Sequence, residues 1–466
     1  MPEPRVLYCE HVLLEDGWAE SVSIVIDATG TITELRREPG SVPAGAEYAH
    51  GSVVPGMPNC HSHAFQRAMA GLTERRGSGE DSFWSWRETM YKLLQHIGPD
   101  ELQVVAEQLY VEMLKLGYTS VGEFHYLHHD SDGRPYADPA EMSHRLIAAA
   151  RGAGMHITLL PVLYCHSDFG AAAPLPGQRR FVHSAEGYQA LQETLHRDYG
   201  GQANIRLGAA PHSLRAVSKP ILQDAISGLD SLDKAAPIHI HIAEQELEVE
   251  GSLACHGKRP VAWLQDNFEV DSRWCLVHAT HMDAAECRAM AASGAVAGLC
   301  PTTEANLGDG IFPAVEFLDA GGNIAIGSDS QVCLDPAQEL RLLEYGQRLS
   351  RRRRTLLASP SQPSVGEFLL RQSLSGGARA LGINAGVIAP GARADLVVLD
   401  GQHPGLYGKR GSTLLDSWVF ACNGTPVKDV MVAGEWRVQQ GVHAHEESVA
   451  GRFRTVMDVL AQVAAR

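Results

Sequence analysis

The segment Pro237-Ile238-His239-Ile240-His241-Ile242-Ala243-Glu244 decides the fold, because it joins a continuous apolar run to ionisable side chains near its end. A short, continuous apolar run is typical of a strand that is buried on both faces of a parallel sheet. Burying imidazoles and a carboxylate in such a strand costs several kcal/mol for each charge that lacks a partner. The segment therefore predicts a buried parallel strand whose carboxyl end carries chemistry.

Seven further runs of the same kind occur along the chain. Each is apolar and ends in polar residues: Ser52–Pro58, Thr119–Tyr126, His156–Tyr164, Ile205–Ser213, Trp274–Thr280, Ala295–Pro301 and Asn323–Ser330. Helical periodicity fills most of the intervals, for example in Glu101–Leu116 and Ala262–Phe268. Eight strands alternating with helices predict an α/β fold, a (β/α)8 TIM barrel, with catalytic groups at the carboxyl ends of the strands.

The two chain ends carry shorter β segments separated by turn residues. They lie at Val6–Leu14, Ser21–Asp27 and Thr31–Arg36, and again at Ala394–Leu399, Trp418–Ala421 and Val427–Val432, before Gly434-Glu435. Each group is too small to stand alone, so we expect both to form one small β-sandwich domain. The predicted division is a first sandwich part at 1–57, the barrel at 58–382, a second sandwich part at 383–446 and a C-terminal helix at 447–466.

Composition excludes several classes of function. The chain of 466 residues is 44% hydrophobic and 20% charged, which is typical of a soluble globular protein. A formal net charge of −16 argues against nucleic acid or an anionic membrane as a partner. Scattered single cysteines, no signal peptide and no apolar stretch of about 20 residues predict a cytoplasmic protein with reduced thiols. The arginine run at 351–354 is interpreted as a solvated helix face.

Histidines and an aspartate close three other predicted strands. His61 and His63 follow the first run and project to the same side of an extended chain. His278 lies near the end of the sixth run and Asp329 near the end of the eighth. Imidazole and carboxylate groups bind zinc and similar divalent ions, and a bound cation would offset the cost of burying these groups together. The pattern predicts a metal site at the barrel mouth.

This order of motifs resembles the amidohydrolase superfamily. Members carry HxH after strand one, HxxE at strand five, His at strand six and Asp at strand eight. The resemblance implies that one divalent metal ion is held by His61, His63, His241 and Asp329, with Glu244 and His278 beside it. Zinc is the expected ion, although iron and manganese accept the same ligands. Strand four ends in residues 209–215 without a lysine, which is similar to the mononuclear deaminase branch. His239 is a rival ligand on the same face, but His241 is preferred because it has the spacing to Glu244 and lies nearer the strand end, and His239 is expected to pack one layer down.

The chemistry expected of this set is hydrolysis that releases ammonia. Zinc coordination lowers the pKa of water from about 15.7 to about 7. Asp329 would accept a proton from that water, and His278 would orient it or polarise the substrate. Glu244 would protonate the substrate nitrogen and pass a proton to ammonia. The alternative for Glu244 is that it only orients a histidine ligand.

A distinctive set of residues lies near the strand ends, at 61–67, 84–87, 124–126, 211–215 and 327–331, and in the stretch 335–348. Together they are similar to the formimidoylglutamate deiminases of histidine degradation. That resemblance implies hydrolysis of N-formimino-L-glutamate to N-formyl-L-glutamate and ammonia, in a homodimer. The substrate is a small dicarboxylate, and arginine matches a carboxylate with two parallel hydrogen bonds. Five substrate-binding residues are expected: Gln66, Arg87, Tyr126, His212 and Arg215.

Other interpretations stay open from sequence. Arg67 could replace Gln66 if the loop turned differently, and Arg87 could form a surface ion pair instead. The alternative enzyme is an aminohydrolase of a purine or related ring amine, for which Trp84 and Trp86 would supply stacking. A non-catalytic barrel is a third possibility, but such a protein would be expected to have lost one of the four metal-binding positions.

Overall fold

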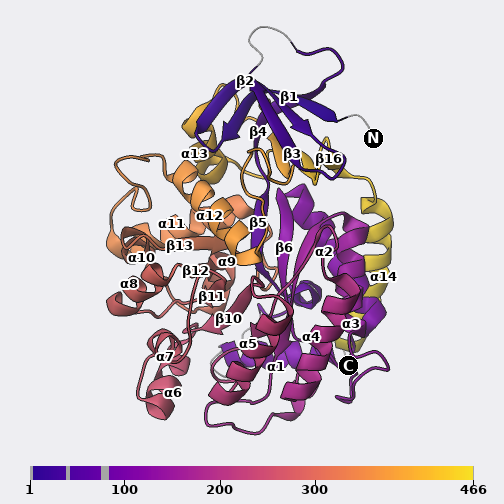
Figure 1. The fold of residues 1–466 in the computed structure, drawn as a ribbon, viewed down its shortest axis with the longest axis vertical. Helices are drawn as coiled ribbons and strands as arrows, with labels where there is room; N and C mark the ends of the chain where they lie inside the picture. Colours follow the sequence, from indigo (N-terminus) through magenta and orange to yellow (C-terminus); the bar gives the residue numbers. More distant parts are fainter. Residues whose placement is uncertain (1–3, 38–41, 75–82, 465–466) are drawn as a thin grey trace.

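The computed structural model describes residues 4–37, 42–74 and 83–464 of the chain, in which two units are built around different sheets. One is a barrel of parallel strands surrounded by helices. The other is an eight-stranded sheet that both chain ends build together, at the top of Figure 1. The helix α14 (Glu446–Ala464) runs back along the side of the barrel against α2 (Pro99–Lys115).

The barrel strands are short, parallel and buried. They are β5 (Met57–Ser62), β6 (Tyr118–His125), β7 (His156–Leu163), β8 (Ile205–Leu207), β9 (Ala210–Pro211), β10 (Ile238–Ile242), β11 (Trp274–His278), β12 (Val296–Leu299) and β13 (Asn323–Ile326). Parallel bridges at Ala209–Ile238 and Ser62–Asp329 join the two halves of the barrel. The predicted parallel barrel, with strands buried on both faces, is therefore confirmed.

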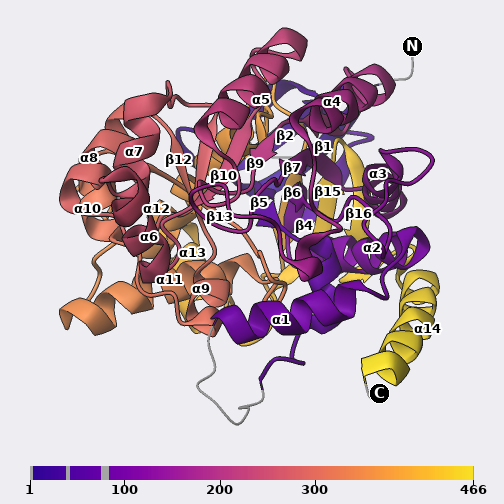
Figure 2. The ribbon, with the colours of Figure 1, turned by 90° about the horizontal axis from the view of Figure 1, so that it is seen from below.

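Helices follow the barrel strands and cover them, as the end-on view shows (Figure 2). Besides α2 and α14 they are α1 (Phe83–Leu94), α3 (Glu141–Ala153), α4 (Ala185–Tyr199), α5 (Lys219–Leu232), α6 (Glu246–His256), α7 (Pro260–Asn267), α8 (Ala284–Ser293), α9 (Pro301–Leu307), α10 (Ala314–Asp319), α11 (Pro336–Arg351), α12 (Val365–Leu381) and α13 (Gly411–Ala421), with 3-10 turns η1 (Ala64–Met69) and η2 (Pro176–Gln178). The two helices expected at 101–116 and 262–268 are α2 and α7.

The second sheet joins the two ends of the chain. Its strands are β1 (Arg5–Leu14), β2 (Gly17–Ile26), β3 (Ile32–Arg37), β4 (Glu47–Pro55), β14 (Leu396–Leu399), β15 (Val427–Val432), β16 (Glu435–Gln439) and β17 (Val442–His443), in the order β17-β16-β15-β14-β4-β1-β2-β3. The junction is the antiparallel pair β4–β14, where Val54 lies opposite Val397. The β-sandwich domain that was expected from both chain ends is therefore present.

The structure corrects the predicted first barrel run. Residues 52–55 belong to β4 of the terminal sheet, and the barrel begins with β5 at Met57. The chain crosses from one sheet to the other at Gly56, where a Cβ atom would lie 2.3 Å from Cγ2 of Thr119. One unbroken apolar run thus contributes strands to two sheets. Apolar character alone does not show where the first strand ends and the second begins.

Two smaller predictions were also wrong. Trp418–Ala421 is the end of α13 rather than a strand, because Leu414, Leu415 and Trp418 are spaced to bury one helical face. In the arginine run, α11 ends at Arg351, and Arg352 has a left-handed φ of 54°. The four arginines are exposed as expected, but at a helix end and not along a helix face.

Within the described ranges, no helix is both long enough and apolar enough to span a lipid bilayer.

We predict that Gly376→Ala destabilises the barrel. A Cβ atom at this position of α12 would lie 1.9 Å from the carbonyl oxygen of Ile324 in β13, against which α12 packs. An unhindered helical glycine would gain about 1 kcal/mol on this change, whereas overpacking costs about 1–3 kcal/mol. Chemical denaturation should show a lower free energy of unfolding, while the exposed neighbour Ser375→Ala should show none of this loss. A stabilised Gly376→Ala would contradict the close packing.

Candidate metal centre and pocket

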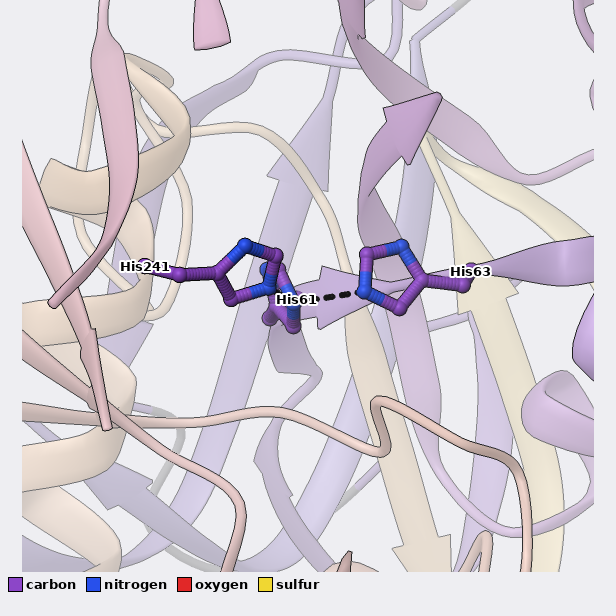
Figure 3. Close-up of side chains that lie close together, drawn as sticks. All are labelled: His61, His63 and His241. Carbon is purple, nitrogen blue, oxygen red and sulfur yellow. Dashed lines mark hydrogen bonds between the residues drawn. The ribbon is translucent and has the colours of Figure 1, made fainter. Parts of the chain in front are cut away.

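Three imidazoles converge at the carboxyl ends of two barrel strands on opposite sides of the barrel. His61 lies in β5, His63 directly follows it, and His241 lies in β10. The Nε2 atom of His61 lies 3.2 Å from Nε2 of His63 and 3.0 Å from Nε2 of His241. Figure 3 shows the three rings turned toward one another with nitrogen atoms at the centre.

The environment of these rings fits a cation between them. His63 Nδ1 donates to the carbonyl of Phe124 at 2.8 Å and His241 Nδ1 to the carbonyl of His212 at 3.2 Å, so each Nε2 presents a lone pair. Burial lowers the pKa of His63 to about 3 and lowers those of His61 and His241 well below the usual value. Neutral nitrogens this close repel unless a positive charge lies between them. The donor set therefore suits a divalent ion with imidazole ligands.

Asp329 completes this cluster from the loop after β13. Its Oδ1 atom lies 3.4 Å from Nε2 of His63 and 3.7 Å from Nε2 of His61, while Oδ2 lies 3.7 Å from Nε2 of His278. Burial raises the pKa of Asp329 to about 7; nearby Glu244 also raises it, and His278 opposes this rise. The carboxylate thus bridges the three-histidine cluster and His278.

His278 and Glu244 form the other side of the site. His278 Nε2 lies 3.8 Å from Oε1 of Glu244, and His278 Nδ1 lies 3.3 Å from Oε1 of Glu304. Burial alone would lower the pKa of His278, but Glu244, Glu304 and Asp329 outweigh burial and raise it well above its usual value. His278 therefore lies between two carboxylates and faces both Glu244 and Asp329.

Strained backbone marks the points where the strands end. Ala243, His278 and Asp329 have left-handed φ angles of 50°, 66° and 44°. This conformation costs of order 1–3 kcal/mol for a residue other than glycine and is typical of functional sites. Hydrogen bonds hold one of these turns in place: Asn59 accepts from the Ser328 N–H at 3.1 Å, and Gln331 donates to Ser62 Oγ at 3.0 Å. These bonds fix the Asp329 loop to β5.

A pocket opens beside the cluster. All five residues expected to bind substrate line it: Gln66, Arg87, Tyr126, His212 and Arg215. Gln66 Nε2 donates to Tyr126 Oη at 2.9 Å, and the Arg87 guanidinium lies 5.7 Å from the centre of the Tyr91 ring. Arg215 is 8% exposed, and its Nε lies 3.8 Å from Oε2 of Glu248. The pocket combines two cations with neutral donors next to the candidate metal centre.

The structure also places the residues that sequence left open. The His239 side chain does not join the histidine cluster; its Nε2 donates a hydrogen bond to the carbonyl of Ala380 at 2.7 Å. Arg67 pairs with Glu112 at 2.8 Å rather than lining the pocket. Trp86 lines the pocket, whereas the side chain of Trp84 lies outside the described residues.

Three residues of the site were missed by sequence reasoning. Glu304, in α9, lies beside His278 and accepts from the Cys300 N–H at 2.8 Å. Glu248, in α6, faces Arg215. Tyr164 lines the pocket and receives a 2.8 Å hydrogen bond from Gln178. Tyr164 closed a predicted strand and could have been found by its position, but the two glutamates lie on helices, where carboxylates are commonly solvent-exposed.

Comparison with known proteins agrees with this geometry. Residues 52–437 match the Amidohydrolase family. A formimidoylglutamate deiminase of Pseudomonas aeruginosa is 52% identical over 455 residues, covering 97% of this chain and 99% of that protein. A 5-methylthioadenosine/S-adenosylhomocysteine deaminase of Natronomonas pharaonis is 26% identical, covering 82% of this chain and 80% of that protein.

Solved structures give the same result. An amidohydrolase from Brucella melitensis is similar with a TM-score of 0.93 at 47% identity, covering 98% of this chain and all of that chain (100%). An adenosine deaminase from Xanthomonas campestris with bound zinc shares the fold, with a TM-score of 0.81 at 23% identity and coverage of 99% and 100%. Sequence, fold and the arrangement of histidines and aspartate lead to one assignment: the chain belongs to the amidohydrolase family.

Proposed function

We propose that this protein is a formimidoylglutamate deiminase, which hydrolyses N-formimino-L-glutamate to N-formyl-L-glutamate and ammonia. The observation that carries the proposal is the placement of Arg87 and Arg215 in one pocket with His241, Glu244 and Asp329. Two guanidinium groups balance the two carboxylates of the substrate. The similarity to the Pseudomonas enzyme, which extends over nearly the whole of both chains, supports the same substrate. A role in histidine degradation, in the cytoplasm and as a homodimer, is part of this proposal by the family resemblance.

We further propose that one zinc ion is held by His61, His63, His241 and Asp329. Bound there, zinc would lower the pKa of water from 15.7 to about 7 and so supply a nucleophile at neutral pH. The zinc-bound relative in the same fold and the converging Nε2 atoms support this choice of metal.

The side chains around the centre divide the proton transfers between them. Asp329 accepts a proton from the attacking water. His278 lies between Asp329 and Glu244 and orients the water toward the imino group. Glu244 protonates the imino nitrogen as the carbon–oxygen bond forms. The proton that Asp329 took from the water then passes to the amino nitrogen, the carbon–nitrogen bond breaks, and the nitrogen leaves as ammonia. The remaining hydroxyl proton returns to Glu244, and the water oxygen stays in the formyl group. Each general acid–base step of this type contributes about 10²–10⁴-fold to rate.

The deciding experiment is an assay of ammonia release by purified zinc-loaded protein. N-formimino-L-glutamate should be turned over, and guanine and adenosine should not. Mass spectrometry should identify N-formyl-L-glutamate as the other product. Activity on the purines alone would reject the substrate assignment while leaving the family unchanged.

We predict that Arg215→Met weakens substrate binding without loss of metal. Arg215 is buried in the pocket, so its replacement leaves one substrate carboxylate without a charged partner; the expected cost is about 2–5 kcal/mol in kcat/KM. Zinc content should stay at the wild-type value. The exposed arginine variant Arg353→Met serves as the matched control and should behave as wild type. Unchanged kinetics in Arg215→Met would remove this residue from the substrate site.

A further inference from the structure

Glu248 is a buried carboxylate that contacts two separate parts of the site. It lies in the first turn of α6 and is 3% exposed. Its Oε1 atom accepts a hydrogen bond from the Ala243 N–H at 3.1 Å. Its Oε2 atom lies 3.8 Å from Nε of Arg215. One side chain therefore connects the turn after β10 with the pocket arginine.

Each of these contacts supports a group that the proposed reaction uses. Ala243 has a left-handed φ of 50° and immediately precedes Glu244, so the bond from its N–H stabilises the turn that directs Glu244 into the pocket. Among the described residues, Glu248 is the one carboxylate whose oxygen lies within 4.0 Å of an Arg215 nitrogen. A buried guanidinium without such a partner would carry a large desolvation cost.

The pKa shifts of Glu248 and Arg215 agree with an ion pair between the two side chains. Burial raises the pKa of Glu248, and Arg215 opposes that rise. For Arg215, burial lowers the pKa, but Glu248 and Glu244 outweigh burial and raise it. A substrate carboxylate approaching Arg215 therefore meets a cation that is already oriented by its own counter-charge.

We infer that Glu248 is a positioning residue of the proposed deiminase, which aligns Arg215 for the substrate carboxylate and holds the turn that aims Glu244. The inference rests on the proposed function, because it assigns Arg215 to a substrate carboxylate and Glu244 to the imino nitrogen. Glu248 itself is absent from the residues that line the pocket. It acts through its two neighbours.

Two substitutions separate the two contacts. Glu248→Gln keeps an oxygen for the Ala243 N–H but removes the charge that faces Arg215, so KM for N-formimino-L-glutamate should rise about tenfold with kcat within about twofold of wild type. Glu248→Ala removes both contacts, so kcat should also fall about tenfold. Glu250→Gln, an exposed glutamate on the same helix, is the matched control and should leave both constants unchanged.

A double substitution tests whether Glu248 acts through Arg215. In the Arg215→Met background, Glu248→Gln should raise KM no further, because the group that it orients is gone. Thermal unfolding and zinc content should be measured on every variant, since a merely structural role would lower stability and alter KM and kcat together. If Glu248→Ala fails to fold, the isosteric Glu248→Gln and its double variant still decide the question.

The outcomes distinguish the two proposals. Wild-type protein that releases ammonia from N-formimino-L-glutamate, combined with a Glu248→Gln variant of unchanged KM, would overturn the role of Glu248 alone. Additive effects of Glu248→Gln and Arg215→Met would overturn it as well. Wild-type protein that is inactive on this substrate would overturn the proposed function, and with it this inference.

Discussion

His241→Ala is expected to lose both bound zinc and turnover. His241 Nε2 lies 3.0 Å from His61 Nε2, so its removal takes one of three converging nitrogens from the proposed centre. Without the ion, deprotonated water at neutral pH becomes rarer by about eight to nine powers of ten, and kcat/KM should fall by several orders of magnitude. Metal analysis of the purified variant should find far less than one zinc per chain, and a chelator should no longer change its thermal unfolding.

His239→Ala is the matched control for this loss. It removes an imidazole from the same strand, two residues away, but His239 bonds to the carbonyl of Ala380 and not to the cluster. The variant should be less stable and still bind zinc. Zinc retained by His241→Ala but lost by His239→Ala would show that the wrong histidine of β10 was assigned to the metal.

His239 and His241 show how much of the candidate metal site could be predicted from the sequence. A strand with side chains alternating at a period of two places His239 and His241 on one face, so periodicity alone left both as candidates. The difference comes from tertiary packing, because the strand ends at Ile242 and only His241 lies at the level of His61 and His63. The position of His241 nearer the strand end predicted that it lies at the barrel mouth and that His239 packs one layer deeper, and these contacts agree with that order.

The fold itself was largely predictable because a buried parallel strand has a simple signature. Continuous apolar runs located the barrel strands that follow β5, since both faces of such strands are covered. The signature failed at residues 52–58, where β4 and β5 share one apolar run across Gly56, and at Trp418–Ala421, where a short apolar run belongs to a helix. In both places the deciding factor is a partner strand or helix that is distant in sequence.

The residues missed in the site have a common physical reason. Glu248 and Glu304 act by contacting Arg215 and His278, and both lie on the helices that come after barrel strands rather than at the strand ends. A search for polar residues at the ends of predicted strands finds the groups that face the barrel mouth directly. Groups that support them are specified by helix placement, which no local pattern encodes.

Glu244→Gln is expected to keep the metal and lose the chemistry. Glu244 lines the pocket, and its Oε1 atom lies 3.8 Å from His278 Nε2. Glutamine has nearly the same shape but cannot give a proton to the imino nitrogen, so kcat should fall about 10²–10⁴-fold. Zinc content should stay at one per chain, in contrast to His241→Ala, and KM should change little because Arg87 and Arg215 remain in place.

The comparison of kcat with zinc content separates the two roles considered for Glu244. If Glu244 only oriented a histidine ligand, its replacement would weaken metal affinity about 10–100-fold, and added zinc would restore turnover. If it is the proton donor, saturating zinc would leave kcat at its low value. Glu246→Gln, which changes an exposed glutamate two residues away, should match wild type in both measurements. Recovery of Glu244→Gln by zinc would therefore assign the proton transfer to His278 or Asp329 instead.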